Sequence, residues 1–135
     1  MSRLLNDLDY RFKNIAFQFL ARLTEAGIPV MIITTLRTIE EQKQAVADKV
    51  SWTYNSKHLP QSPDGKSLAI DVCPFAQFTL HGTNKLMWDA TDPAWQEMGK
   101  IGQALGLKWG VVKDGQRIDL GHFEWVQLSE RMSKA

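Results

Sequence analysis

The chain has 135 residues, of which 44% are hydrophobic and 23% are charged, and these values are typical of one soluble globular domain. Its formal net charge of +1 argues against a nucleic-acid-binding protein. No apolar run reaches the roughly 20 residues of a membrane-spanning helix, and the single cysteine, Cys73, excludes an internal disulfide and a cysteine-rich zinc-finger array.

The first predicted element is an amphipathic helix over residues 4–26. Apolar residues recur there at helical spacing: Leu8, Phe12, Ile15, Ala16, Phe19, Leu20 and Leu23. Gly27 and Pro29 follow and predict its end. The opening "MSRLLNDLDYRF" has acidic residues where a signal peptide needs an unbroken apolar stretch. We therefore expect a protein made in the cytoplasm without a signal peptide.

A strand and a second helix come next. Residues 30–36 form a short run rich in β-branched side chains, which is typical of a buried strand. Thr38 is followed three positions later by Glu41, and this capping-box pattern predicts a helix over residues 38–50. The polar residues 51–67 then predict a long loop.

The middle of the chain contains fewer regular elements. We predict a strand at residues 68–72 and irregular structure over residues 76–91, with a short strand at 85–88. Asp92 precedes a proline and an apolar pattern of helical period, so it is the expected N-cap of a third helix. Gly106 is the expected end of that helix.

Two strands complete the predicted fold, at residues 107–112 and 121–126. The segment between them, "KDGQRID" at 113–119, contains an Asp-Gly turn. Repeats and linkers are absent from the sequence, so we expect a single domain over residues 1–135. The order of elements predicts an α+β fold, with a small antiparallel sheet flanked by helices.

One carboxylate stands out because it lies inside an apolar run. Asp71 is in the middle of "LAIDVCPF", and burying an unpaired carboxylate is costly unless something neutralises it. His58 precedes this strand and His122 lies in "DLGHFEW" near the other end of the chain. Two imidazoles and one carboxylate would leave a zinc ion one open position for water, as in catalytic sites. Spacing alone does not bring the three together, and taken singly each histidine is better explained as an ordinary surface or hydrogen-bonded residue.

The motifs around these residues resemble a known family of zinc peptidases. The matching residues are Ser56, His58, Ala69 and Asp71 in a first motif, and Asp119 and His122 in a second. The family includes the D-alanyl-D-alanine carboxypeptidases of the vancomycin-resistance type and the L-alanyl-D-glutamate endopeptidases of bacteriophage lysis enzymes. "TTLRTIEEQ" is similar to the family's strand-to-helix turn, with Arg37 as its arginine and Gln42 on the following helix.

The resemblance implies a hedgehog-like zinc fold and a role for each matching residue. One Zn²⁺ per chain would be held by His58, Asp71 and His122. Asp119 would be the general base that takes a proton from the zinc-bound water. Arg37 would polarise the scissile carbonyl or hold a substrate carboxylate, and Ser56 would contact the substrate.

The same resemblance implies a substrate. An aspartate at the position of Asp119, rather than a glutamate, favours an L-alanyl-D-glutamate endopeptidase that cuts the stem peptides of bacterial peptidoglycan. The lack of a signal peptide fits a phage endolysin, monomeric and without a membrane partner, that reaches the cell wall from the cytoplasm after the membrane is breached. The alternatives are a D,D- or L,D-carboxypeptidase, a catalytically silent wall-binding module, and a structural zinc domain closed by Cys73 or Glu124.

The chain departs from the family pattern at two places. The segment between the first two metal ligands is longer by about half a dozen residues, and a loop insertion of this size costs little closure entropy. Gly121 stands where the family often has proline. Because side chains alternate along an extended strand, we expect a turn at Leu120–Gly121 that brings Asp119 and His122 to the metal.

Several of these residues also admit simpler roles. Arg37 could pair with Glu40 or Glu41. Ser56 could have a structural role alone, which is to shape its loop. Glu124 is a second candidate for the base or for a residue that supports a metal ligand.

The remaining candidates are expected to be structural. We expect Cys73 to be a small core residue and His81 to lie on the surface. Of the five tryptophans, we expect one or two to line a groove, and we place Trp88 and Trp109 in the core.

Overall fold

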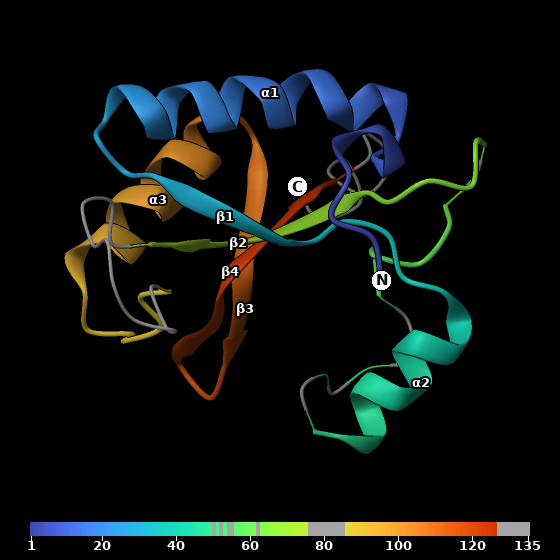
Figure 1. The fold of residues 1–135 in the computed structure, drawn as a ribbon. Helices are drawn as coiled ribbons and strands as arrows, with labels where there is room; N and C mark the ends of the chain where they lie inside the picture. Colours follow the sequence, from blue (N-terminus) through green and yellow to red (C-terminus); the bar gives the residue numbers. More distant parts are fainter. Residues whose placement is uncertain (50, 52, 54–55, 62, 76–85, 127–135) are drawn as a thin grey trace.

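Three α-helices and a four-stranded sheet make up the described part of the chain, in agreement with the predicted α+β class. The computed structural model describes all residues except 50, 52, 54–55, 62, 76–85 and 127–135 (Figure 1). The elements are η1 (Leu5–Asp7), α1 (Tyr10–Glu25), β1 (Val30–Thr34), α2 (Ile39–Ala47), β2 (Ala69–Pro74), α3 (Pro93–Ala104), β3 (Leu107–Lys113) and β4 (Gln116–Trp125). Within these described residues, no helix is both long enough and apolar enough to cross a membrane.

The sheet is antiparallel throughout, with the strand order β1-β2-β4-β3. Its two inner strands are therefore β2 and β4, which lie far apart in the sequence. Their register places Asp71 opposite His122. Helices α1 and α3 lie together against the sheet, whereas α2 stands apart from them (Figure 1).

Helix α1 begins at Tyr10 and not at residue 4, the start that the apolar spacing predicts. The reason is Asp9, whose carboxylate accepts a hydrogen bond of 2.8 Å from the backbone N–H of Arg11 and so caps the helix at Tyr10. The residues Leu5–Asp7 form a separate 3₁₀ turn. The buried face of α1 carries residues of the predicted apolar pattern: Phe12, Ala16, Phe19 and Leu23.

Two glycines let helix α3 pack directly on aromatic side chains of the sheet. A Cβ atom at Gly99 would lie 2.3 Å from the ring of Trp109, and one at Gly102 would lie 2.6 Å from the ring of Phe123. Both rings belong to buried residues and contact the helix backbone where another helix would carry side chains. This close packing fixes β3 and β4 against α3. Trp109, which is only 6% exposed, is a core residue as predicted.

The capping box of the second helix is confirmed. The Oγ1 of Thr38 accepts a hydrogen bond of 3.1 Å from the N–H of Glu41, and the Glu41 carboxylate accepts one of 2.9 Å from the N–H of Thr38. The predicted elements at 30–36, 68–72 and 107–112 are present as β1, β2 and β3 with shifted ends. Residue 85 lies outside the described residues, and Leu86 forms an isolated bridge with Phe75.

The predicted Asp-Gly turn is confirmed, but the connection is shorter than residues 113–119, most of which are strand. Strand β4 begins at Gln116 and pairs with β3 immediately after a tight turn at Asp114 and Gly115. These two residues have φ values of 52° and 77°. Left-handed conformations at both central positions match the twist of a two-residue hairpin, which lets pairing start beside the turn.

Candidate metal centre and active site

The structure brings His58, Asp71 and His122 together at the middle of the sheet. The ligand atoms of the three side chains all lie within 4.8 Å of one another. The Oδ1 atom of Asp71 is 3.0 Å from the Nε2 of His58 and 2.9 Å from the Nδ1 of His122. Asp71 and His122 come from the paired strands β2 and β4, and His58 comes from the loop before β2.

His58 shows that this cluster fits a metal ion. Its Nδ1 lies 2.6 Å from the carbonyl oxygen of Thr35, so Nδ1 carries the proton and donates it. In that tautomer the Nε2 atom carries an unshared electron pair and no proton. It is buried without a hydrogen-bond partner and faces the Asp71 carboxylate. A proton or a metal ion between Nε2 and the carboxylate oxygen satisfies both atoms, and nitrogen and carboxylate oxygen are ligands that zinc accepts.

Asp71 is kept in the form that can bind a cation. Burial alone would raise its pKa, but His58 and His122 beside it hold the pKa of this carboxyl well below its usual range. The Nη2 atom of Arg37 lies 3.8 Å from the other oxygen of the carboxylate. These neighbours account for a carboxylate in the middle of a buried strand.

Glu124 contacts the second ring nitrogen of His122. Its Oε1 lies 2.9 Å from Nε2, while Nδ1 faces Asp71. Burial would lower the pKa of His122, but the hydrogen bonds with Asp71 and Glu124 raise it to about 10. If Nδ1 gives its lone pair to a metal, Nε2–H remains to donate to Glu124. A carboxylate in that position orients the ring and makes it a better ligand.

Cys73 lies in the hydrophobic core, as predicted, and not with the three candidate ligands. Its side chain is fully buried, and burial raises the pKa of the thiol to about 11. A thiol in that state is a small apolar residue rather than a ready metal ligand.

Asp119 occupies an irregularity in the pairing of β3 with β4. The register shifts between Trp109 and Val111, and the backbone of Asp119 has a φ of 56°, in the left-handed region. The expected turn at Leu120–Gly121 was therefore wrong, since the backbone departs from the strand conformation at Asp119 itself. Aspartate tolerates this region better than most residues, and such strain is common at functional sites.

The environment of Asp119 makes its carboxylate more basic. Asp119 as a residue is exposed, but the atoms packed around its carboxyl raise its pKa by partial desolvation and the charge of Asp71 raises it further, while His122, His58 and Arg37 oppose the change. These interactions place Asp119 within electrostatic reach of the cluster of His58, Asp71 and His122. A raised pKa suits a group that must accept a proton and later return it.

Gly121 allows β4 to approach β2 beside the cluster. A Cβ atom there would lie 2.4 Å from the carbonyl oxygen of Val72, a separation that backbone atoms do not permit. The need for glycine at this position is therefore steric. The sequence pattern identified the residue but not this close contact.

The side chain of Arg37 points toward the cluster. Its Nη1 donates a hydrogen bond of 3.0 Å to Gln42 on α2, and its backbone N–H donates to the carbonyl of His58. Ser56 supports the same loop, because its Oγ accepts a hydrogen bond of 3.1 Å from the N–H of His58. Both residues hold His58 in place, and their contacts with a substrate stay predictions.

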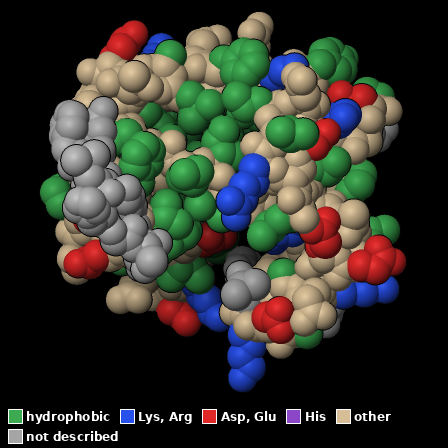
Figure 2. All heavy atoms as spheres, in the orientation of Figure 1, with side chains coloured by type: hydrophobic (Ala, Val, Ile, Leu, Met, Phe, Trp, Pro, Cys, Tyr) green, Lys and Arg blue, Asp and Glu red, His purple; other side chains and the backbone are tan. Residues whose placement is uncertain are grey.

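A pocket of about 340 Å³ opens beside the cluster. It is lined by Ile33, Asp71, Val72, Trp88, Ala90, Trp95, Arg117, Ile118, Asp119, Leu120 and Gly121. Figure 2 shows a recess on this face in which acidic atoms are flanked by hydrophobic side chains. Asp71 and Asp119 therefore line the same pocket as the apolar side chains of Trp88 and Trp95.

Trp88 is part of that wall, and its assignment to the core was wrong. The residue is 53% exposed, and its ring stacks on Trp95 with 6.2 Å between the ring centroids. It precedes α3 in an irregular segment, where sequence periodicity carries no information on burial. His81 lies outside the described residues.

Comparison with known proteins supports the fold. Neither family models nor curated proteins match the sequence. The chain is similar to the crystal structure of Serratia marcescens L-Ala D-Glu endopeptidase ChiX, with a TM-score of 0.63 and 19% sequence identity. The match covers 97% of this chain and 87% of that one. A likeness at this level of identity concerns the fold, and it agrees with the predicted small α+β peptidase fold.

Proposed function

We propose that the protein is a zinc-dependent peptidoglycan endopeptidase that hydrolyses the L-alanyl-D-glutamate bond of bacterial stem peptides. The observation that carries the proposal is the cluster of His58, Asp71 and His122, which lies beside a pocket lined by Asp119. The likeness in fold to an L-Ala D-Glu endopeptidase supports the choice of bond. So does an aspartate, rather than a glutamate, at the position of the base.

In the proposed mechanism each site residue has a separate role. A zinc ion held by the three ligands would lower the pKa of a water molecule at its open position. Asp119 accepts a proton from the attacking water and returns it to the leaving amine, a task for which its raised pKa is suited. Arg37, beside Asp71, orients the scissile carbonyl or a substrate carboxylate. The indoles of Trp88 and Trp95 form the apolar side of the peptide-binding pocket.

The proposal extends to where the protein works. A monomer that is made in the cytoplasm and released through a breached membrane would meet the cell wall as a lysis enzyme, the role of a phage endolysin. Its partner is the stem peptide alone.

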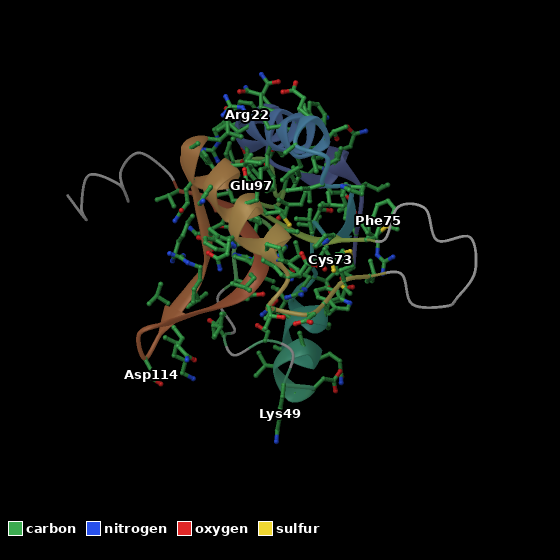
Figure 3. The ribbon with its side chains drawn as sticks, turned by 90° about the vertical axis from the view of Figure 1, so that its left-hand side faces the viewer. Arg22, Lys49, Cys73, Phe75, Glu97 and Asp114 are labelled. Carbon is green, nitrogen blue, oxygen red and sulfur yellow. The ribbon has the colours of Figure 1, made fainter. Side chains whose placement is uncertain are left out.

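Digestion of purified sacculi tests the activity. With the wild-type protein, mass spectrometry should detect released stem peptides that begin at D-Glu. A chelator should abolish this release, and added Zn²⁺ should restore it. Asp119→Asn should abolish release. The control is Asp114→Asn, the same change at another aspartate with positive φ, placed at the tip of the β3–β4 hairpin (Figure 3). Loss of one terminal D-Ala would instead identify a carboxypeptidase, and no cleavage by zinc-loaded protein would contradict the enzymatic proposal.

A further inference from the structure

The pocket beside the metal cluster contains one basic side chain, Arg117, among its lining residues. We propose that Arg117 binds the free α-carboxylate of the D-glutamate on the leaving side of the scissile bond. It would thereby select stem peptides in which this carboxylate is not amidated. The inference rests on the proposed function and adds to it a specificity-determining residue.

Arg117 is held in place by Trp109 on the neighbouring strand. Its Nη1 donates a hydrogen bond of 2.5 Å to the carbonyl oxygen of Trp109, and its Cζ lies 4.5 Å from the centroid of the Trp109 ring. Trp109 is itself fixed, because its ring packs against Gly99. The hydrogen bond to Trp109 uses one of the five N–H donors of a guanidinium group. A guanidinium fixed in this way loses little further freedom when it binds an anion.

The position of Arg117 suits a carboxylate close to the reacting bond. Arg117 and Asp119 are two residues apart on β4, and both line the pocket together with Asp71. Among the lining residues of the pocket an anion meets two carboxylates and one cation, so Arg117 is the lining group that can pair with it. Arg37, beside Asp71, is then left to orient the scissile carbonyl. Arg117 and Trp88 are exposed in the free protein. A bound peptide would cover both and exclude water from the pairing, which strengthens ionic attraction.

The chemistry of the substrate supplies the matching anion. In a stem peptide the chain continues through the γ-carboxyl of D-glutamate, so its α-carboxylate stays free and lies two bonds from the nitrogen that leaves. Arginine binds a carboxylate through two parallel hydrogen bonds, and a neutral amide cannot accept both. A charge-assisted contact of this kind corresponds to a preference on the order of 10- to 100-fold.

Two synthetic peptides that differ only at this group test the inference. One is L-Ala-γ-D-Glu-L-Lys and the other carries D-isoglutamine in place of D-glutamate. Wild-type protein should cleave the acid with a kcat/KM about 10- to 100-fold higher than the amide. Arg117→Gln should lose this preference through slower cleavage of the acid alone, and Arg117→Lys should restore part of it. Lys113→Gln, the same loss of charge at an exposed residue of β3, should keep the wild-type preference.

The possible results separate the inference from the proposed function. If Arg117→Gln keeps the preference, or slows both peptides equally, Arg117 acts only through its packing on Trp109 and the inference is wrong. If the wild-type protein cleaves neither peptide, the proposed function fails, and NMR titration of zinc-loaded protein with both peptides decides the inference. Tighter binding of the acid that disappears in Arg117→Gln would uphold a carboxylate site, whereas equal binding of the two peptides would reject it.

Discussion

The indole Nε1–H of Trp109 donates a hydrogen bond of 2.8 Å to the carbonyl oxygen of Leu120 on the adjacent strand. The bond crosses the place where the pairing of β3 and β4 shifts register, and Leu120 directly follows Asp119. The buried side chain of Trp109 thus holds in place the segment that carries Asp119, the proposed general base. The strained φ of Asp119 persists because the surrounding packing determines it.

Removing this hydrogen bond should impair catalysis without removing the metal. Trp109→Phe retains an aromatic ring against Gly99 but lacks the indole N–H. We expect kcat to fall by about 10-fold or more, since small displacements of a catalytic group are costly. Zinc affinity should stay near the wild-type value. Backbone amide shifts at Asp119 and Gly121 in NMR spectra should change, and unchanged shifts with normal kcat would show that the bond has no positioning role.

The carboxylate of Asp119 should be needed for turnover but not for folding. Asparagine also tolerates the left-handed region, so Asp119→Asn should keep the melting temperature and the zinc content. We expect kcat to fall by about 10²- to 10⁴-fold, the usual contribution of general acid–base catalysis. A variant that lost zinc together with activity would instead make Asp119 part of the metal-binding set.

Glu124 should contribute to metal affinity through His122. Glu124→Ala removes the acceptor of the Nε2–H, and loss of such a contact commonly weakens metal binding about 10- to 100-fold. Competition with a chromophoric chelator measures the change in Kd, and Glu124→Gln should recover part of it. Glu97→Ala, on exposed α3 surface, is the control (Figure 3). Equal zinc affinity in Glu124→Ala and wild type would contradict this role.

A methyl group at Gly121 should separate the two strands that carry Asp71 and His122. Gly121→Ala places a Cβ 2.4 Å from the carbonyl oxygen of Val72, so one strand has to move. We expect a loss of about 1–3 kcal/mol in the free energy of unfolding, measured by urea denaturation. Zinc should also bind more weakly. A variant as stable as wild type would mean that the strands separate at no cost.

The ion pair at the start of α1 should make stability depend on pH. Hydrogen bonds from Arg11 hold the pKa of the buried Asp9 carboxyl below its usual range. Its stabilising effect is therefore complete above the unfolded pKa of about 3.9 and is lost as the pH falls through the lower folded value. Asp9→Asn should unfold at lower urea than wild type at pH 7, and the difference should shrink toward pH 2. A constant difference would exclude the charge of Asp9 as its cause.

The sequence predicted those features that depend on nearby residues. The capping box of Thr38 and Glu41 and the apolar face of α1 need only local spacing, and both are present. The family motifs also named the three residues that the sheet brings together. His122 comes close to Asp71 and His58 because β2 pairs with β4, and the spacing of residues in the sequence does not predict that pairing.

The features that sequence reasoning missed arise from contacts between distant elements. The irregularity at Asp119 depends on how β3 is paired, and Gly110 on that strand has a φ of 56°. Gly99 matters because Trp109 packs on it from another element. Composition likewise gives no sign that Trp88 is exposed, since its burial depends on what covers the segment before α3.

The cluster of His58, Asp71 and His122 also has a consequence for the lifetime of the folded chain. Asp71 and His122 are separated by 51 positions, and a chain with one cysteine has no disulfide to join such distant segments. An ion held by all three would act as a cross-link present only in the folded state, so binding would oppose unfolding. Where zinc is scarce, the chain would open and meet proteases sooner. The supply of free zinc would then determine how long the protein survives, separately from how fast it works.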